Sequence, residues 1–293
     1  MKLVTFTDRH DPASGAAVGA LVNEGAAVLD FRRADLQMPA EALACFDLDG
    51  PWLPRAREIA ERPPSGALVR IDAVRLRAPV PRPGKLVCIG LNYRDHAAES
   101  KMPVPERPVL FSKFTTAVIG PGDPIVIPSA CEKVDYEVEL AIVIGRRIKG
   151  ATRDEAARAI LGYTIVNDVS ARDFQFGDGQ WQRGKSCDTF APMGPSIVTA
   201  DEVGDPQTLG IHLRVNGRTL QSSNTNQMVF GAVALVAFIA ETITLEPGDV
   251  IATGTPPGVG FARQPPVFLK SGDLVDVEID RLGVLSNPVN AER

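Results

Sequence analysis

The alternation of apolar and polar positions predicts a small strand-rich unit at the start of the chain. The turn residues Asn23, Glu24 and Gly25 separate two of the expected strands. The segment WLPRAREIAER, residues 52–62, has a helical spacing of apolar residues. The predicted strands are KLVTF (2–6), AAVGALV (16–22), AAVLDF (26–31) and AVRLRAPV (73–80).

From residue 85 onward the pattern predicts mostly short strands with two helices among them. The helices are RDEAARAIL (153–161), with Thr152 as its cap, and GAVALVAFIAETI (231–243). The pair Asn216-Gly217 is a strong hairpin signal between two strands. The strands are KLVCIGL (85–91), PVLFSKF (108–114), DPIVIP (123–128), YEVELAIVIG (136–145), GYTIVNDV (162–169), GIHLRV (210–215), DVIATG (249–254) and LVDVEI (274–279).

This order of elements fits neither a parallel βαβ array nor a helical bundle. We therefore expect a mixed α+β fold that is mainly β and largely antiparallel. The stiff run of prolines in residues 78–84 is a plausible joint. It would separate a small N-terminal α+β domain, residues 1–77, from a catalytic β domain, residues 85–293.

Composition and charge exclude several classes of protein. Hydrophobic residues make up 44% of the 293 residues, charged residues 23%, and mean hydropathy is +0.01, as in an ordinary globular protein. The net charge is -5 without a basic block, so we expect no nucleic-acid partner. No apolar run approaches the roughly 18 residues needed to span a bilayer, and no signal peptide is recognisable, which predicts no membrane partner and a cytoplasmic location. The four cysteines lie more than 40 residues apart and are expected to be reduced and mostly buried.

The segment KVDYEVELAIVIG, residues 133–145, places Asp135, Glu137 and Glu139 at every second position of an expected strand. Like charges on one strand face repel each other unless a cation lies between them. Asp168, near the end of another apolar strand, supplies a further carboxylate. These oxygen donors suit Mg²⁺, Mn²⁺ or Ca²⁺ better than Zn²⁺. The alternative, a solvated acidic face, fits poorly with the apolar run that follows.

Three further segments carry candidate chemistry. In GLNYRDHAAES, residues 90–100, His96 and Glu99 are spaced to meet on one helical face, as a base and its orienting carboxylate or as a plain surface pair. A Gly-rich loop at 176–184 ends near Lys185, which could neutralise an oxyanion or remain solvated. The segment ATGTPPGVG, residues 252–260, could cradle an anion with its backbone N–H groups, but it is not a nucleotide-binding motif.

These motifs, taken in order, resemble the fumarylacetoacetate hydrolase family. The matching stretches are GLNYRDHAAE, PVLFSKF, DYEVELAIVIG, NDVSARDFQ, GKSCDTFAPMGP and TGTPPGVG, spread over about residues 85–285. The resemblance implies a β-roll core, a homodimer and the shorter bacterial branch of the family.

The resemblance also implies a role for each matching residue. Glu137, Glu139 and Asp168 would bind Mg²⁺ or Mn²⁺, with Ca²⁺ as a crystal substitute, and Asp135 would stay outside the first shell. His96 and Glu99 would activate water, and Lys185 would contact the substrate. Further substrate-binding residues would be Lys113, Gln175, Thr253, Gly254 and Thr255.

The expected activity is metal-dependent hydrolysis of the C–C bond of a 2,4-dioxo acid, of the acylpyruvate or fumarylpyruvate type, with a pyruvate enolate as the leaving group. Two reactions at the same site are alternatives: decarboxylation of oxaloacetate and isomerisation of 2-hydroxyhepta-2,4-diene-1,7-dioate. A non-catalytic metal-binding β domain is a third. The pocket beyond C4 is expected to draw on the N-terminal domain and on residues 100–107 and 176–184, whose composition does not identify the acyl group.

Overall fold

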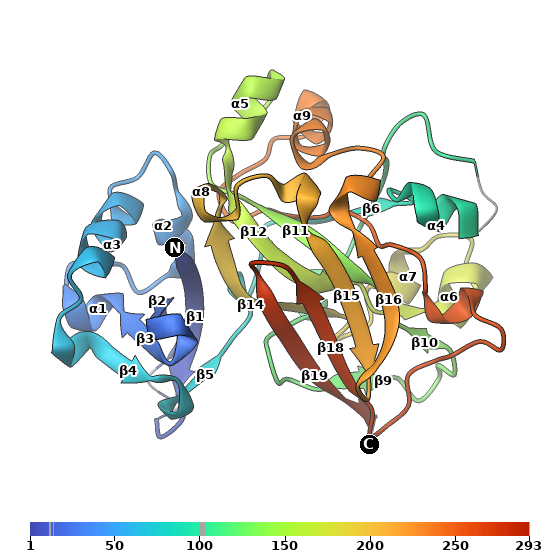
Figure 1. Cartoon of the computed structure of the whole chain (residues 1–293), viewed down its shortest axis with the longest axis horizontal. Coiled ribbons are helices and arrows are strands. Elements are labelled where there is room, and N and C mark those ends of the chain that lie inside the picture. The colour runs from blue at the N-terminus through green and yellow to red at the C-terminus, as the bar shows by residue number, and fades with distance from the viewer. Residues whose placement is uncertain (12, 14, 100–102, 293) are drawn as a thin grey trace.

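The computed structural model describes residues 1–11, 13, 15–99 and 103–292. A small α/β unit that contains the N-terminus stands beside a larger body made mainly of strands (Figure 1). Residues 100–102 lie outside the described residues, and so does that part of the 100–107 segment expected to contribute to the acyl pocket.

The N-terminal unit is an antiparallel sheet with helices packed on it. The apolar face of α3 directs Leu53, Ala56 and Ile59 into the core, which explains the helical spacing of that segment. Its strands are β1 (Lys2–Asp8), β2 (Ala17–Val22), β3 (Ala27–Asp30), β4 (Leu68–Arg70) and β5 (Val74–Leu76), and its helices are α1 (Phe31–Ala34), α2 (Ala42–Phe46) and α3 (Trp52–Glu61).

The sheet of this unit continues into the larger body. Strand β1 pairs with β14 (Ala191–Thr199), with Lys2 opposite Val198, so both parts belong to one sheet, which has 12 strands within the described residues. Ala78 and Val80 of the proline-rich segment are buried in the core that the two parts share. The division into domains at 78–84 stays a prediction.

The rest of this sheet is formed by the central and C-terminal segments of the chain. Beyond β14 the order is β12, β11, β17, β6 and β7, with β8 beside β14. The pairs are antiparallel except for β17 with β6 and β14 with β8. The bounds are β6 (Leu86–Gly90), β7 (Val109–Ser112), β8 (Val118–Ile119), β11 (Val138–Ile144), β12 (Ile160–Asn167) and β17 (Val250–Ala252).

A second sheet packs in front of the large one, as the orange and red strands of Figure 1 show. Its strand order is β16, β15, β18, β19 and β9, and a separate short pair joins β10 to β13. The bounds are β9 (Ile125–Ile127), β10 (Val134–Asp135), β13 (Ser170–Ala171), β15 (Gly210–Val215), β16 (Arg218–Asn224), β18 (Leu274–Ile279) and β19 (Gly283–Ala291).

Strand β11 is buried on both faces, which accounts for its unbroken apolar sequence. Leu140 and Ile142 pack into the core between the two sheets, while Ala141 and Val143 pack into the core beneath the N-terminal unit. Alternate residues of a strand point to opposite faces, so a strand between two cores has no polar face. The prediction of a buried strand here is confirmed.

The hairpin and a helix in each of the two predicted segments are confirmed. Helix α5 (Arg153–Arg158) begins with Thr152, whose side chain accepts from the N–H of Glu155 in a capping box. This helix ends at Arg158 and not at residue 161, because Ile160 and Leu161 belong to β12. Helix α9 (Ala232–Thr242) lies beside α5. Asn216 and Gly217 have φ of 51° and 77°, the left-handed conformations that a tight hairpin between β15 and β16 requires. The other helices are α4 (Arg94–Glu99), α6 (Arg172–Gly177), α7 (Gln182–Lys185) and α8 (Ala200–Val203).

Strand β14 begins in a segment whose residues favour a turn. Prolines and a glycine in APMGP, residues 191–195, argue locally for a turn, but this segment begins the nine-residue central strand β14. The pairing of β14 with β12 shifts register between Tyr163 and Ile165, and Ile165 lies opposite Gly194. This irregularity accommodates residues that a regular ladder would exclude.

Candidate functional site

The acidic site lies where the first residues of β11 pair with the last residues of β12. The antiparallel pairing puts Val138 opposite Asn167, so the start of β11 lies beside the end of β12. The N–H of Asp168 donates to the carbonyl of Glu137 over 2.9 Å. The strand ends therefore bring together carboxylates that are about 30 positions apart in sequence.

Glu137, Glu139 and Asp168 form one compact cluster, called the acidic triad below. One ligand oxygen from each lies within 4.8 Å of the others, and all three side chains are buried. Three converging carboxylates with no His or Cys among them form a donor set for a hard divalent cation such as Mg²⁺ or Mn²⁺. The residues present therefore fit the cation that was predicted.

The expected single strand from 133 to 145 is in fact two strands, β10 and β11. The N–H of Glu137 donates to the side chain of Asn167, and the N–H of Val138 donates to the side chain of Gln221. Because side-chain oxygens replace backbone partners at this point, the chain can leave the ladder without burying unpaired N–H groups. Asp135 consequently belongs to a different strand from Glu139 and lies outside the triad.

Two buried lysines bind the triad directly. Lys185 Nζ donates to Glu137 over 2.8 Å and to Asp168 over 2.7 Å. Lys113 Nζ donates to Asp168 over 2.5 Å and to the carbonyl of Val169, and its side chain has no exposed surface. Lys113 therefore supports Asp168 in this structure, although it was predicted to contact substrate.

Arg172 is the main residue that the sequence analysis missed. Its Nη2 donates to Glu137 over 2.5 Å, its Nε to Asp135 over 2.9 Å, and its Nη1 to Gln175 over 2.7 Å. Asp135 also accepts from the backbone N–H groups of Gly260 and Phe261. The signal was present in SARDFQ, because Arg172 precedes Gln175 by about one helical turn. Asp135 thus anchors the arginine that holds Glu137.

The charges of this cluster nearly balance. Four buried carboxylates, including Asp135, face three buried cations, so one negative charge is in excess when all are ionised. A divalent cation would turn this into one positive charge in excess, which would favour an anionic ligand.

The two glutamates of the triad differ in their protonation equilibria. Burial opposes ionisation of Glu137, but Lys185 and Arg172 prevail and lower its pKa to about 2. Burial, together with the charges of Asp168 and Glu137, raises the pKa of Glu139 well above its usual value. Glu139 accepts a hydrogen bond from the N–H of Gly254 over 2.9 Å. Ionised Glu139 is therefore the member of the triad that gains most from a bound cation.

His96 and Glu99 form a hydrogen-bonded pair on α4. The distance from His96 Nδ1 to Glu99 Oε2 is 3.1 Å, and Glu99 also accepts from the N–H of Gly258 over 3.0 Å. A proton on Nδ1 that donates to Glu99 leaves Nε2 as the basic nitrogen. Gly258 has φ of +100°, and a Cβ there would lie 2.2 Å from the carbonyl oxygen of Leu220. The contact with Glu99 thus depends on a glycine at this position.

A cavity of about 460 Å³ is lined both by Glu137 and Glu139 of the triad and by the pair of His96 and Glu99. Its polar lining includes His96, Glu137, Glu139 and Lys185. Two edge-to-face aromatic pairs line it as well, Phe111 with Trp181 at 5.5 Å and Phe176 with Phe261 at 5.6 Å between ring centroids. The cavity combines a charged floor with apolar walls, the usual form of a small-molecule site.

The remaining predicted residues divide between the cavity and its supports. Gln175 and Thr255 line the cavity. Thr253 is fully buried and donates its hydroxyl to the carbonyl of Leu140, while the N–H of Gly254 binds Glu139. Thr253 therefore binds the backbone next to Glu139, and Gly254 binds Glu139 itself, so both support the triad in this structure. Part of the predicted Gly-rich loop is helical in α6 and α7, and Phe176 of α6 and Trp181, just before α7, line the cavity.

The fold and this site match one family of enzymes. The family model described as fumarylacetoacetate (FAA) hydrolase C-terminal matches residues 85–290. The chain belongs to the fumarylacetoacetate hydrolase family, and it is an enzyme of that family. The resemblance inferred from the motifs is confirmed, and a non-catalytic β domain is set aside.

Similar proteins cover nearly the whole chain. Oxaloacetate tautomerase fahd2, mitochondrial, of Xenopus laevis is 44% identical over 99% of this chain and 90% of its own length. The structure of 2-hydroxyhepta-2,4-diene-1,7-dioate isomerase from Mycobacterium marinum is 37% identical with a TM-score of 0.77, covering 100% of this chain and 99% of that one. Fumarylacetoacetate hydrolase from Exiguobacterium antarcticum is 36% identical with a TM-score of 0.85 and covers 100% of both chains.

These relatives bear on the remaining predictions. The vertebrate relative shows that proteins of this length are not confined to the bacterial branch. Among the residues that the structure describes, no helix is long and apolar enough to cross a membrane. The four cysteines are free, and three of them are buried. The cytoplasmic location, the homodimer and the absence of a nucleic-acid partner stay predictions.

Proposed function

We propose that the protein is a tautomerase of 2-oxo diacids of the oxaloacetate type that depends on Mg²⁺ or Mn²⁺. The observation that carries this proposal is the placement of His96, oriented by Glu99, on the same cavity as Glu137 and Glu139 of the acidic triad. A base beside a cation site is the arrangement that proton transfer next to a carbonyl group requires. The names of the tautomerase and isomerase relatives support the same class of reaction.

The triad would hold the cation, and Lys185 would add positive charge on the cavity side. The bound cation would supply Lewis acidity at the 2-oxo group, which makes the protons on C3 more acidic. Asp168 and Glu137 lie within hydrogen-bond distance of Lys185, so this lysine keeps the triad in place and attracts a dianionic substrate.

His96 would carry out the proton transfer. Its Nε2 takes a proton from C3, the electrons of that C–H bond form the double bond between C2 and C3, and the C2 oxygen takes a proton from solvent. Glu99 holds the imidazole in the required tautomer through Nδ1, and Gly258 N–H holds Glu99. The reverse sequence converts the enol to the ketone.

Hydrolysis of 2,4-dioxo acids is a second candidate, favoured by one observation. A cavity of about 460 Å³ with aromatic walls has room beyond a four-carbon diacid. The same His96 and Glu99 pair could take a proton from water, which would attack C4 of an acylpyruvate. Decarboxylation of oxaloacetate is a further reaction that the cation and the diacid allow.

One set of assays separates these reactions. Ketonisation of enol-oxaloacetate, hydrolysis of acetylpyruvate and fumarylpyruvate, and decarboxylation of oxaloacetate are measured side by side with Mg²⁺ and with Mn²⁺. We expect ketonisation to be fastest, and His96→Ala to slow it by about 10²- to 10⁴-fold with the affinity for Mg²⁺ unchanged. His212→Ala, a variant at a histidine on β15, is the matched control. Ketonisation at the uncatalysed rate, with rapid cleavage of acetylpyruvate, would instead establish the hydrolase.

A further inference from the structure

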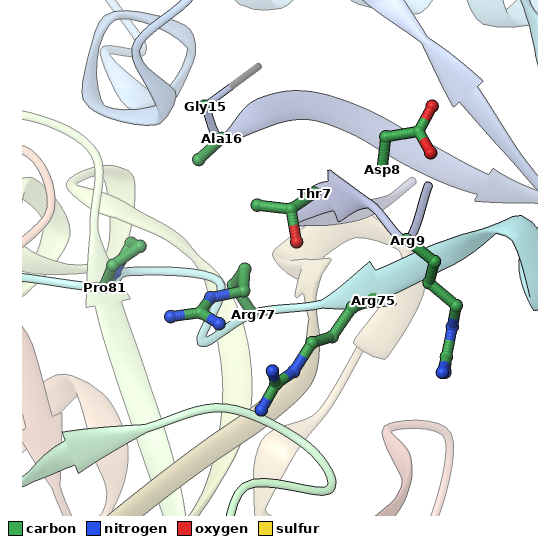
Figure 2. A pocket seen from close by; sticks show the side chains of 8 residues that line it. All are labelled: Thr7, Asp8, Arg9, Gly15, Ala16, Arg75, Arg77 and Pro81. Atoms are coloured by element: carbon green, nitrogen blue, oxygen red, sulfur yellow. The ribbon is translucent and has the colours of Figure 1, made fainter. Parts of the chain in front are cut away.

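A second cavity lies on the N-terminal unit and carries three arginines. This arginine cleft has a volume of about 580 Å³, within the range of small-molecule sites. Figure 2 shows the side chains around it. They are Thr7, Asp8, Arg9, Gly15, Ala16, Arg75, Arg77 and Pro81.

Strand register puts the cationic side chains on one face. In the antiparallel pair of β1 and β5, Thr7 lies opposite Arg75. Arg77 follows Arg75 by two positions, and Arg9 follows Thr7 by two, so all four share one face of this pair. The N–H of Arg9 still donates to the carbonyl of Ala73, which continues the ladder by one residue. The apolar pair Phe6 and Leu76 faces the other way, into a small core.

Two of the three guanidinium groups are held in place, each by one acceptor of its own. Arg9 donates from Nε to the carbonyl of Val74 over 2.7 Å. Arg75 donates from Nη2 to Asp123, whose second oxygen accepts from the N–H of Gly120. Both arginines keep further N–H donors for a ligand while their orientation is restricted. This preorganisation lowers the entropic cost of binding an anion.

Arg77 is half-buried, and its guanidinium has no hydrogen bond or ion pair within residues 1–11, 13, 15–99 and 103–292. Asp8 is not the partner of Arg77, because the Asp8 carboxylate accepts from the N–H of His10 and lies 3.8 Å from Nη2 of Arg33. Figure 2 shows the Asp8 carboxylate turned away from Arg75 and Arg77, while the Thr7 hydroxyl is directed toward them. The cleft therefore presents one unpaired cation, two partly satisfied cations and a hydroxyl group.

Solvated surface arginines are the ordinary alternative, and Arg9 and Arg75, which are both exposed, would fit it, whereas Arg77 is half-buried. Three like charges on one strand-pair face repel each other, however, and Asp123 compensates one of them. This excess of positive charge lies on a protein whose net charge is -5. Guanidinium groups bind carboxylate and phosphate oxygens in a bidentate manner, and several of them together suit a ligand with more than one negative charge.

We propose that the arginine cleft binds a small multivalent oxyanion, a dicarboxylate or a phosphate. Arg77 and Arg75 contact its oxygens, Arg9 adds a third charge, and Thr7 donates a hydrogen bond. This site is independent of the acidic triad and of the reaction proposed above.

The proposal is tested by titrating the full-length protein with succinate, inorganic phosphate and, as a monovalent control, acetate, in an isothermal calorimeter at low salt. We expect one saturable site per chain for succinate, phosphate or both, and no saturation with acetate. Arg77→Ala should weaken that site by about tenfold or more, because a hydrogen-bonded charge is lost. Arg77→Lys should bind with intermediate affinity, since it keeps the charge without the fork. Anion binding at the acidic triad does not involve Arg77 and would persist in both variants.

Arg218→Ala removes an exposed arginine from β16 and is the matched control for net charge. Thr7→Val provides a second variant that keeps every charge, and it should weaken binding by a smaller factor. Saturation by succinate alone or by phosphate alone identifies the ligand class within the proposal. Equal affinity of the wild type and Arg77→Ala, or no saturable binding of either dianion, overturns it.

Discussion

Binding of Mg²⁺ should release about one proton from Glu139. Burial and the neighbouring charges of Asp168 and Glu137 raise the pKa of Glu139, whereas Glu137 has a pKa of about 2 because of its cationic partners. A carboxyl group must be ionised to bind a cation, so a proton held on Glu139 has to leave as the metal enters. The variable to change is therefore the pH at which the metal-free protein is titrated with Mg²⁺.

The expected pH dependence of the Mg²⁺ affinity follows from the release of this single proton. The raised pKa means that Glu139 stays protonated in the metal-free protein above the usual glutamate pKa of 4.5. Within the window from that value up to the raised pKa, each pH unit changes the free energy of binding by about 1.4 kcal/mol. The dissociation constant for Mg²⁺ should fall about tenfold per unit as pH rises, and it should become constant above the pKa of Glu139.

Calorimetric titration at one pH in two buffers, PIPES and imidazole, counts the protons. The slope of the observed heat against the heat of buffer protonation should be close to one proton per Mg²⁺. Glu139→Gln should release about one proton fewer and bind Mg²⁺ at least ~100-fold more weakly, since even residues that contact ligands indirectly contribute 10- to 100-fold. Glu58→Gln, at an exposed position of α3, is the matched control and should behave as the wild type.

Equal observed heats in the two buffers would contradict the release of a proton from Glu139. So would an affinity that is independent of pH between about 5 and 8, across the range where an ordinary glutamate is already ionised. Proton release that persists in Glu139→Gln would assign the proton to another group, such as a lysine displaced from Asp168.

Three further outcomes test individual contacts. Thr152→Ala removes the cap of α5 and should lower the free energy of unfolding in urea by about 1 kcal/mol, with no change in catalysis; an unchanged urea midpoint would show that the cap is dispensable. Gly258→Ala should displace the loop that holds Glu99 and reduce kcat by up to about 100-fold while Mg²⁺ affinity is retained, and a normal kcat would show that Glu99 needs no such anchor. Asp201→Asn breaks the exposed pair with Arg57 between the N-terminal unit and α8, and should lower stability by no more than about 1 kcal/mol. The hydrogen bond from Arg57 lowers the pKa of Asp201, so this contribution should be present above pH ~4 and fade as pH falls below the usual aspartate value; an equal difference between variant and wild type at acid and neutral pH would contradict it.

Local pattern was sufficient for most of the elements and for the composition of the triad. An unbroken apolar run predicts strand β11, and Thr152 and Glu155 at capping-box spacing predict the start of α5. The spacing of Glu137 and Glu139 pointed to a cation because a solvated acidic face fits poorly beside such an apolar run. Strand β14 was missed because proline and glycine argue locally for a turn.

Contacts between distant segments were decided by the tertiary structure. Lys113 was expected in the substrate pocket, but the packing of β7 and its following residues turns it beneath Asp168. Arg172 gained its role only when the chain brought Asp135 and Glu137 around it.

The residue types available for the chemistry, and most of the strands and helices, follow from neighbours along the chain. The central strand β14, the break between β10 and β11 and the mutual placement of the charged groups follow from contacts between distant segments. The antiparallel register of β11 and β12 joins Glu137 to Asp168, and the loop at Gly258 binds Glu99, whose contact with His96 is local to α4. Burial then sets the pKa of each group, because both desolvation and the nearest counter-charge exist only in the folded chain.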